Sequence, residues 1–259
     1  MLPLQGVGVL VTRPEPQAMP LCRLLESCGA MVLRLPAIGI KPVGDTQDLR
    51  RRLGALEAFD LIIFTSANAV RFGAPLLDQR RDLTLAAIGP ATARALHQAG
   101  LSSSMTPREG SDSENLLLQP MLVHAAGRRI LIVKGMYGRE LLREELTRRG
   151  AQVIVADVYK REPAVHGAAE LAGLEAKLTA GEIQVITATS VEIAASLLHM
   201  APASLRREFD RVHWLVPGAR VAGAVRERGV TAPILQADTA EDQDLVAAIV
   251  RWRSSVSGA

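Results

Sequence analysis

The chain has 259 residues, 48% of them hydrophobic and 22% charged, and a formal net charge of +3 at pH 7. This composition is typical of a folded protein with two domains of ordinary size, and it excludes a disordered chain. The small charge, with only two Trp, two Tyr and four Phe, does not favour a nucleic-acid partner, although a locally basic surface would suit an anionic small molecule.

No apolar run approaches the length of a membrane span, and the first residues have neither the basic nor the apolar region of a signal peptide. We therefore expect a cytoplasmic protein with no membrane partner. Cys22 and Cys28 fall on one expected helix, where they make neither a disulfide framework nor a metal site. The histidines show no ligand spacing, so we expect no metal.

The first expected unit is a strand, a helix and a second strand. Residues 7–11 form an apolar strand, residues 17–27 have the pattern of a helix that Gly29 ends, and residues 31–35 form the second strand. Residues 36–42 have prolines at both ends and an extended pattern, which indicates a crossing between domains.

Alternating helices and strands follow. A polar helix is expected at 45–56, where Arg50-Arg51-Arg52 most simply forms a solvated face. Apolar strands at 61–64 and 85–88 each precede a helix whose first residues are small or polar. The next expected elements are a short strand at 103–106, a polar turn at 110–114 and a helix at 115–123.

The stretch 128–163 predicts a further strand, helix and strand. An apolar strand at 130–133 ends in a turn at Lys134-Gly135. A helix starts at about Gly138 and is closed by basic residues and a glycine, and a second strand spans 153–158.

The first unit and this later unit form an internal repeat. Residues 9–42 match residues 130–163 at a constant offset without a gap, which pairs Arg13 with Lys134. Later partners also exist for the strand ends at Thr65 and Gly89, namely Thr189 and Gly218. The alternative to an internal repeat is that two unrelated strand–helix–strand units happen to share helix-ending glycines and other common boundary residues.

The order of these pieces predicts an α/β protein with two similar domains, each a parallel sheet flanked by helices. The repeat is compatible with two tandem halves. It is equally compatible with a swapped arrangement, in which the first unit completes the sheet of the last three. In the swapped form, residues 36–42 and 157–163 would be two antiparallel crossings.

Parallel sheets bind ligands at the carboxyl ends of their strands, where helix N-termini leave free N–H groups. The residues expected there are small, hydroxylic or cationic, and they suit carboxylates better than a metal or a nucleophile. They are Arg13, Thr65, Ser66, Asn68, Gly89, Thr92, Lys134, Gly138, Arg139, Ser190, Gly218 and Arg220. The simpler alternative for each Ser or Thr is a plain helix cap, and for Arg13 and Lys134 a solvated or salt-bridged role.

Tyr159 lies in the second crossing, where two domains would meet, and its phenol could donate a proton. The alternative is a tyrosine whose ring packs in the linker and whose hydroxyl contacts water. The chain has no glycine fingerprint of a dinucleotide fold, no phosphate loop and no nucleophile elbow, which disfavours a nucleotide-dependent enzyme.

Seven motifs occur in one order along the chain. They are V-L-V-T-R-P (9–14), I-I-F-T-S-A-N-A-V (62–70), A-I-G-P-A-T-A-R-A-L (87–96), S-D-S-E-N-L-L (111–117), I-L-I-V-K-G-M-Y-G-R-E-L-L (130–142), V-Y-K-R-E-P (158–163) and V-P-G-A-R-V-A (216–222). This ordered set, which spans essentially the whole chain, resembles the uroporphyrinogen-III synthase family.

The resemblance implies two α/β domains joined by a two-stranded β ladder, the first domain being made from both chain ends. The expected boundaries are 1–36 with 164–259 for that domain, 43–157 for the second domain, and 37–42 with 158–163 for the linker strands.

The resemblance also implies a cofactor-free hydro-lyase of haem biosynthesis. It would cyclise hydroxymethylbilane, a linear tetrapyrrole with eight carboxylates, to uroporphyrinogen III, with loss of water and inversion of ring D. The substrate would fold between the domains of a monomer, with Tyr159 assisting departure of the hydroxyl and Thr92 in the cleft. We also expect a transient contact with hydroxymethylbilane synthase.

Two positions depart from the family pattern. Val221 stands where many members carry a hydroxyl in the second half, which argues against a symmetric pair of threonines. Lys134 stands where arginine is common, so bidentate carboxylate binding is less assured there. A protein of another class, a two-domain binding protein that closes on an anionic metabolite without chemistry, would show the same features, and turnover distinguishes the two.

Overall fold

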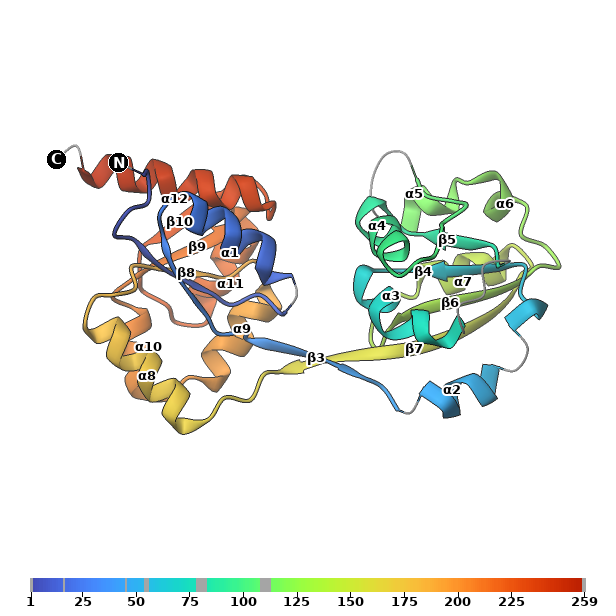
Figure 1. Cartoon of the computed structure of the whole chain (residues 1–259), viewed down its shortest axis with the longest axis horizontal. Helices are drawn as coiled ribbons and strands as arrows, with labels where there is room; N and C mark the ends of the chain where they lie inside the picture. Colours follow the sequence, from blue (N-terminus) through green and yellow to red (C-terminus); the bar gives the residue numbers. More distant parts are fainter. Residues whose placement is uncertain are drawn as a thin grey trace. The chain divides into compact units, whose positions relative to one another are not determined.

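The computed structural model describes residues 2–15, 17–44, 46–53, 56–77, 83–107 and 113–257. The chain divides into two compact units, one formed by Met1–Ile40 with Glu162–Ala259 and the other by Lys41–Arg161. The described residues form two five-stranded sheets with helices packed on them (Figure 1). The predicted α/β class, with parallel sheets flanked by helices, is confirmed.

The first sheet has the order β10-β9-β8-β1-β2, and all its neighbouring strands are parallel. Its strands are β1 (Gly8–Val11), β2 (Met31–Arg34), β8 (Val185–Thr187), β9 (His213–Pro217) and β10 (Ile234–Ala237). The helices of this unit are α1 (Ala18–Ser27), α8 (Ala168–Thr179), α9 (Val191–Met200), α10 (Ala203–Phe209), α11 (Gly218–Glu227) and α12 (Asp242–Ser257). Strands from the beginning and the end of the chain therefore share one sheet.

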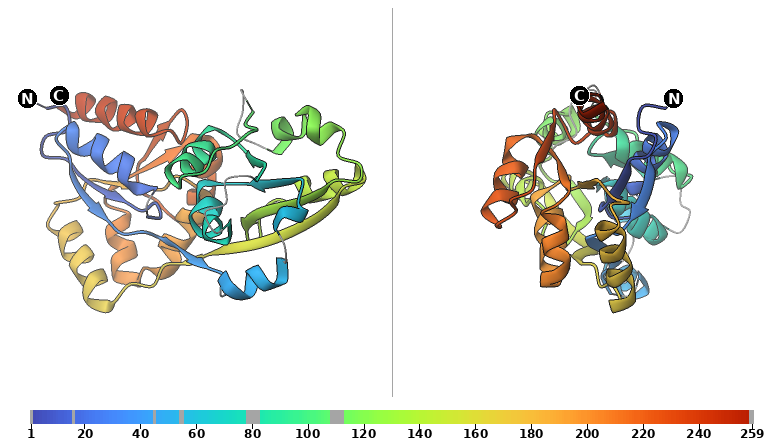
Figure 2. Two further views of the ribbon diagram at one scale, coloured as in Figure 1. Left: turned by 45° about the vertical axis from the view of Figure 1, so that its right-hand side comes forward. Right: turned by 90° about the vertical axis from the view of Figure 1, so that its left-hand side faces the viewer.

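The side chains of β1 alternate between two cores, because successive residues of a strand point to opposite faces. Val9 and Val11 pack with α1 and α12, whereas Leu10 packs with residues of α8 to α11. Figures 1 and 2 show these two layers of helices on either side of the sheet. The buried run ends at Val11, so the polar Thr12-Arg13 pair falls at the carboxyl end of the strand.

The second sheet has the order β3-β7-β6-β4-β5, in which β7, β6, β4 and β5 are mutually parallel. Its strands are β3 (Ile38–Pro42), β4 (Leu61–Phe64), β5 (Leu85–Ala87), β6 (Arg129–Gly135) and β7 (Gln152–Pro163). The helices around it are α2 (Thr46–Leu53), η1 (Leu56–Ala58), α3 (Ala67–Gly73), η2 (Ala74–Leu77), α4 (Pro90–Gln98), α5 (Ser113–Leu117), α6 (Pro120–Val123) and α7 (Leu141–Arg148).

Residues of α5, α6 and α7 pack on one face of this second sheet, against Leu61 and Ile63 of β4. Helix α3 comes close to the sheet at Gly73, where a Cβ atom would lie 3.3 Å from Phe64 Cε1. The glycine therefore allows the end of α3 to approach the sheet closely. The start of α3 lies near the carboxyl end of β4 because only two residues separate them.

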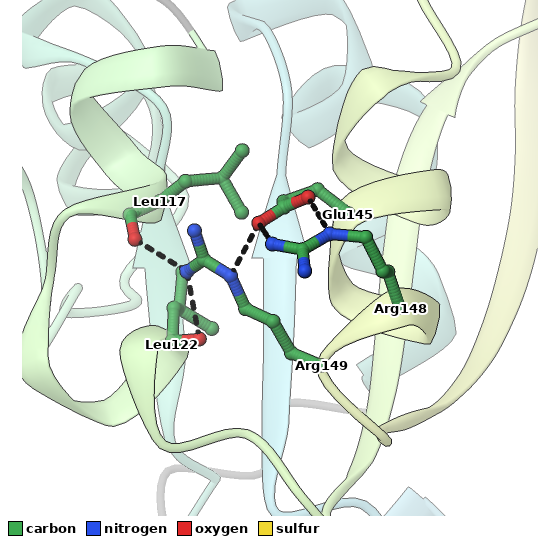
Figure 3. Close-up of polar contacts among 5 residues, drawn as sticks. All are labelled: Leu117, Leu122, Glu145, Arg148 and Arg149. Atoms are coloured by element: carbon green, nitrogen blue, oxygen red, sulfur yellow. Dashed lines mark hydrogen bonds and ion pairs between the residues drawn. The ribbon is translucent and has the colours of Figure 1, made fainter.

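Arg149 ties α7 to the two short helices before it (Figure 3). Its guanidinium donates to the carbonyl oxygens of Leu117 and Leu122, at 2.7 and 3.0 Å, and to Glu145 at 2.7 Å. Arg148 donates to both carboxylate oxygens of Glu145. These bonds satisfy carbonyls at the ends of α5 and α6 that have no partner within the helix.

Hydrogen bonds show that β3 runs antiparallel to β7. Val43 N–H donates to Val158 O over 3.2 Å, and Ala164 N–H donates to Ala37 O over 3.0 Å, so the partner number falls as β3 advances. The separate strand and crossing predicted for 153–163 are one continuous strand of 12 residues.

Two predicted boundaries around Lys134 are wrong. Strand β6 continues through Lys134 and Gly135, whose neighbours on β7 are Asp157 and Tyr159. Helix α7 starts at Leu141 instead of Gly138. A turn lies between the strand and the helix: Gly138 N–H donates to Gly135 O over 3.2 Å, and Tyr137 within the turn has a left-handed φ of 63°.

Three shorter predictions also change. The helix predicted at 115–123 is divided into α5 and α6, because Pro120 cannot continue a helix but suits the first position of the next one. The strand predicted at 103–106 is only a single bridge between Met105 and Ala86. Residues 110–112 of the predicted turn, and residues 45, 54 and 55 of the predicted polar helix, lie outside the described residues. None of the described helices is long and apolar enough to cross a membrane.

Candidate functional site

The predicted site residues of the second unit follow the ends of β4, β5 and β6, or lie beside the end of β6 in β7. Because these four strands are parallel, their carboxyl ends lie along one edge of the sheet. Thr65 and Ser66 follow β4, Gly89 follows β5, and Tyr159 pairs with the last residue of β6. The fold therefore places these groups along a single edge.

Tyr159 has a tightly defined place at this edge. The register of β6 and β7 shifts between Lys134 and Gly135, and Gly135 becomes the neighbour of Tyr159. A Cβ atom at position 135 would lie 2.7 Å from Tyr159 Cε2 and 2.8 Å from its Oη, so only glycine leaves room for the ring. The ring of Tyr159 also stacks with that of Phe72, at 6.0 Å between ring centroids, and Tyr159 is buried.

Ser66 contacts the Tyr159 hydroxyl, with 3.2 Å between Ser66 Oγ and Tyr159 Oη. Ser66 is also the N-cap of α3, and its Oγ accepts a hydrogen bond from Ala69 N–H at 2.9 Å. The capping role considered for this serine is thus confirmed, but the hydroxyl makes a second contact. Thr65 donates from Oγ1 to Val133 O at 3.3 Å, and Asn68 is buried.

Gly89 and Thr92 lie at the start of α4. The Gly89 carbonyl accepts from the N–H groups of Thr92 and Ala93, at 3.1 and 3.0 Å, and Pro90 occupies the first turn. Gly89 itself is extended, with a φ of −174°, which any residue can adopt. Thr92, in the first turn of the helix, is buried.

Lys134 is held by an acidic residue of its own chain. Its side chain is 8% exposed, and its Nζ forms an ion pair with Glu140 and donates to Gly138 O at 3.3 Å. The hydrogen bond from Lys134 lowers the pKa of Glu140 below its ordinary value, and Arg143 adds to the effect. These contacts favour the salt-bridged role for Lys134.

Arg139 differs from Lys134 although it lies only a few residues away. Its side chain is 75% exposed, and its guanidinium is 3.4 Å from Glu114. An exposed ion pair at that separation is weak, because water screens both charges. The guanidinium of Arg139 is therefore exposed and only weakly paired.

The predicted residues of the first unit follow β1, β8 and β9. Arg13 forms an ion pair with Asp242, and it also donates to the carbonyl oxygen of Ala240 and to Thr189 Oγ1, the latter at 3.1 Å. Arg13 thus has an internal carboxylate partner, as Lys134 does, and the salt-bridged role is favoured for both.

Ser190 and Arg220 lie at the N-termini of two helices of this unit. Ser190 caps α9 by accepting from Ile193 N–H at 3.1 Å. Gly218, with a φ of 69°, opens α11, and the side chain of Arg220 in its first turn is exposed. Val221 is buried, as its apolar side chain requires.

Three residues that shape the site were not predicted. Glu140 and Asp242 neutralise Lys134 and Arg13, and Phe72 stacks on Tyr159. Glu140 directly precedes the first residue of α7, a place where acidic residues are favourable, and this is a local signal that could have found it. Asp242 and Phe72 are distant in sequence from their partners, and no sequence spacing points to them.

The chemistry available at these edges is limited in kind. Among the described residues, no group of three His, Cys, Asp or Glu side chains could hold a metal ion. Both cysteines are free, and burial raises the pKa of the Cys22 thiol, so it is a poor nucleophile. The strand ends instead offer short hydroxyls, backbone N–H groups, exposed guanidinium groups and the Tyr159 phenol. Such groups bind carboxylates and can donate a proton.

The fold and these groups define an α/β protein of two units, each with hydroxyls, backbone N–H groups and cations at its strand ends, and with a phenol at the strand ends of one unit. Comparison with known proteins narrows this class. The family model described as uroporphyrinogen-III synthase HemD matches residues 20–247. Uroporphyrinogen-III synthase of Escherichia coli K12 is 34% identical over 256 residues, which cover 94% of this chain and 100% of that protein.

Proteins with lower sequence identity to this chain carry the same family name. A putative uroporphyrinogen-III synthase of Methanothermobacter thermautotrophicus is 29% identical, over 90% of this chain and 94% of that protein. Two solved structures share the fold. They are a uroporphyrinogen-III synthetase from Helicobacter pylori (TM-score 0.62, 14% identity, 95% of this chain and 99% of that one) and a mutant uroporphyrinogen III synthase from Thermus thermophilus (TM-score 0.55, 22% identity, 98% and 100%). This chain belongs to the uroporphyrinogen-III synthase family.

Proposed function

We propose that this enzyme, a lyase of porphyrin and haem biosynthesis, cyclises hydroxymethylbilane to uroporphyrinogen III, with loss of water and inversion of ring D. The observation that carries the proposal is the match to the family model from residue 20 to residue 247, which includes both units. The strand edges support it, because hydroxyls, N–H groups and guanidinium groups suit a substrate with many carboxylates.

Tyr159 is the proposed catalytic residue. Its phenol donates a proton to the hydroxyl at one end of the bilane, the carbon–oxygen bond breaks, and water leaves. The terminal pyrrole attacks the resulting azafulvene through its substituted carbon and forms a spiro intermediate, in which the older bond from that carbon to the neighbouring methylene then breaks. The pyrrole, now inverted, closes the ring through its unsubstituted carbon, and the proton that this carbon loses restores the Tyr159 phenol. Gly135 and Phe72 support this role by fixing the place of the ring before the substrate arrives.

Most of the remaining predicted residues are proposed to hold the substrate. The exposed guanidinium groups of Arg139 and Arg220 recruit carboxylates, while the hydroxyls and backbone N–H groups at the strand ends bind them. The group consists of Thr65, Asn68, Gly89, Thr92, Gly138, Arg139, Ser190, Gly218 and Arg220. Ser66, which contacts Tyr159, is not part of this group. For Arg13 and Lys134, the ion pairs with Asp242 and Glu140 favour a structural role.

We further propose that the two units are the domains of a cytoplasmic monomer. Residues 1–36 with 164–259 form one domain and residues 43–157 the other, and residues 37–42 with 158–163 are the linker strands. The pairing of β3 with β7 supports a two-stranded linker. Because hydroxymethylbilane also closes spontaneously, to isomer I, a transient contact with hydroxymethylbilane synthase would protect it.

The proposed function is tested by the identity of the product. Hydroxymethylbilane is generated enzymatically, the protein is added, and the oxidised porphyrin isomers are separated. We expect predominantly isomer III, since spontaneous closure yields isomer I. If folded protein binds the bilane but only isomer I forms, the proposed enzyme activity is wrong. The alternative function, a binding protein for an anionic metabolite, would then hold.

A further inference from the structure

The hydroxyl of Ser66 has one donor and two acceptor positions. Ala69 N–H can only donate, so Ser66 Oγ accepts that bond and keeps its own proton for another partner. Among the described residues, the other group that bonds Ser66 Oγ is the Tyr159 hydroxyl, 3.2 Å away. If Ser66 donates to Tyr159, its donor and one of its two acceptor positions are used at once.

The contacts of Tyr159 fix the position of its ring and leave the phenol proton free to rotate. Gly135 lies against the ring, Phe72 stacks with it, and the backbone oxygen of Tyr159 accepts from Met136 N–H at 2.8 Å. The remaining freedom is rotation of the phenol proton about the Cζ–Oη bond. A hydrogen bond donated to Oη decides this rotation, because it occupies a lone pair and turns the phenol proton away from the donor.

We propose that Ser66 is a positioning residue that directs the proton of Tyr159 toward the substrate, in place of a residue that binds a substrate carboxylate. This inference rests on the proposed function of Tyr159. The helix cap explains why the serine is well placed for the task. Its backbone is extended, and its Oγ is fixed by the first turn of α3 before any ligand binds. Ser66 therefore acts on the proton-transfer step and not on binding.

The test is a double-mutant cycle with Ser66→Gly and Tyr159→Phe, followed by the rate of isomer III formation. Glycine is chosen because it removes the hydroxymethyl side chain and is still a good N-cap, so that the helix start loses little stability. We expect Ser66→Gly alone to lower kcat by about 10-fold, with KM nearly unchanged. In the Tyr159→Phe background the same change should have no further effect, because its target is gone. Ser66→Thr, which keeps the hydroxyl, should restore most of kcat.

Ser190→Gly provides the matched stability control, since Ser190 makes the same cap on α9 without a tyrosine contact in the described structure. Both glycine variants should unfold at similar denaturant concentrations. The inference is overturned if Ser66→Gly lowers kcat by the same factor in both backgrounds, or if it raises KM and leaves kcat unchanged. Full activity of the single variant Tyr159→Phe is a separate outcome, which would overturn the proposed role of Tyr159 itself.

Discussion

Gly135 and Tyr159 illustrate how a single missing Cβ atom can determine a site. The ring of Tyr159 occupies the space that a side chain at position 135 would need, with Oη only 2.8 Å from the ideal Cβ position. Backbone conformation is not the reason, because Gly135 is not among the residues with positive φ. The requirement for glycine is therefore one of space, and it links the end of β6 directly to the proposed catalytic group.

Replacing Gly135 by alanine should displace the Tyr159 ring. Overpacking of this kind costs about 1–3 kcal/mol of unfolding free energy, and the moved phenol should lower kcat by at least about 10-fold. Denaturant unfolding and the isomer III assay measure both effects. Gly173→Ala is the control, because Gly173 lies in α8 at a position where an added Cβ would have no atom within 4 Å. This change should be neutral or slightly stabilising. A Gly135→Ala enzyme with normal kcat would show that the contact is not needed.

Lys134 and Arg139 should respond differently to the loss of their charges. Lys134→Met removes a buried ammonium whose partner is Glu140, so we expect lower stability, by about 1 kcal/mol, with KM changed less than about twofold. Arg139→Met removes an exposed cation, so KM should rise about 5-fold or more without loss of stability. Substrate titrations and denaturant unfolding of both variants test this contrast. The opposite pattern would make Lys134 the carboxylate ligand.

At the scale of the element, α7 depends on Arg149 for its attachment to α5 and α6. Three hydrogen bonds connect its guanidinium to Leu117, Leu122 and Glu145 (Figure 3). Arg149→Lys keeps the charge but cannot reproduce the planar fork, so we expect a loss of about 2 kcal/mol in the free energy of unfolding. Arg148→Lys is the matched control, because Glu145 is the one partner that Arg148 has among the described residues, and this change should affect stability little. Equal losses in both variants would contradict this account.

The same cluster predicts an acid response. Hydrogen bonds from Arg148 and Arg149 lower the pKa of Glu145 from 4.5 to about 2. Because the folded pKa is the lower one, the contribution of Glu145 to stability is present above pH 4.5 and is lost as the pH falls toward 2. Glu145→Gln should flatten this part of the stability profile, as measured by denaturant unfolding at a series of pH values. A variant with the slope of the natural protein would contradict the assignment.

The sequence predicted elements best where the signals are local. The helix-ending glycines Gly29 and Gly150 have φ values of 92° and 86°, as the glycine cap requires. Strand β4 coincides with the apolar run at 61–64. The start of α7 was missed, because the turn from Gly135 to Gly138 is not visible in a pattern of apolar residues.

The candidate site was predicted less well, since its contacts join distant parts of the chain. The strand ends were found from their hydroxyl and cationic residues, but the partner of each cation was not. Arg13 pairs with Asp242, and Tyr159 contacts Ser66 and Phe72. Such pairs depend on sheet order and register, which a single sequence does not encode as a spacing.

At the scale of the whole molecule, the proposed activity requires the Tyr159 phenol for the formation of isomer III. The chain contains only two tyrosines, and Tyr137 is 89% exposed, so the two provide a matched pair of substitutions. The most direct measurement is the rate of isomer III formation by Tyr159→Phe and by Tyr137→Phe, with circular dichroism to verify folding. We predict a loss of about 100-fold or more for Tyr159→Phe and a normal rate for Tyr137→Phe. A folded Tyr159→Phe enzyme with the full rate of isomer III formation would contradict the account.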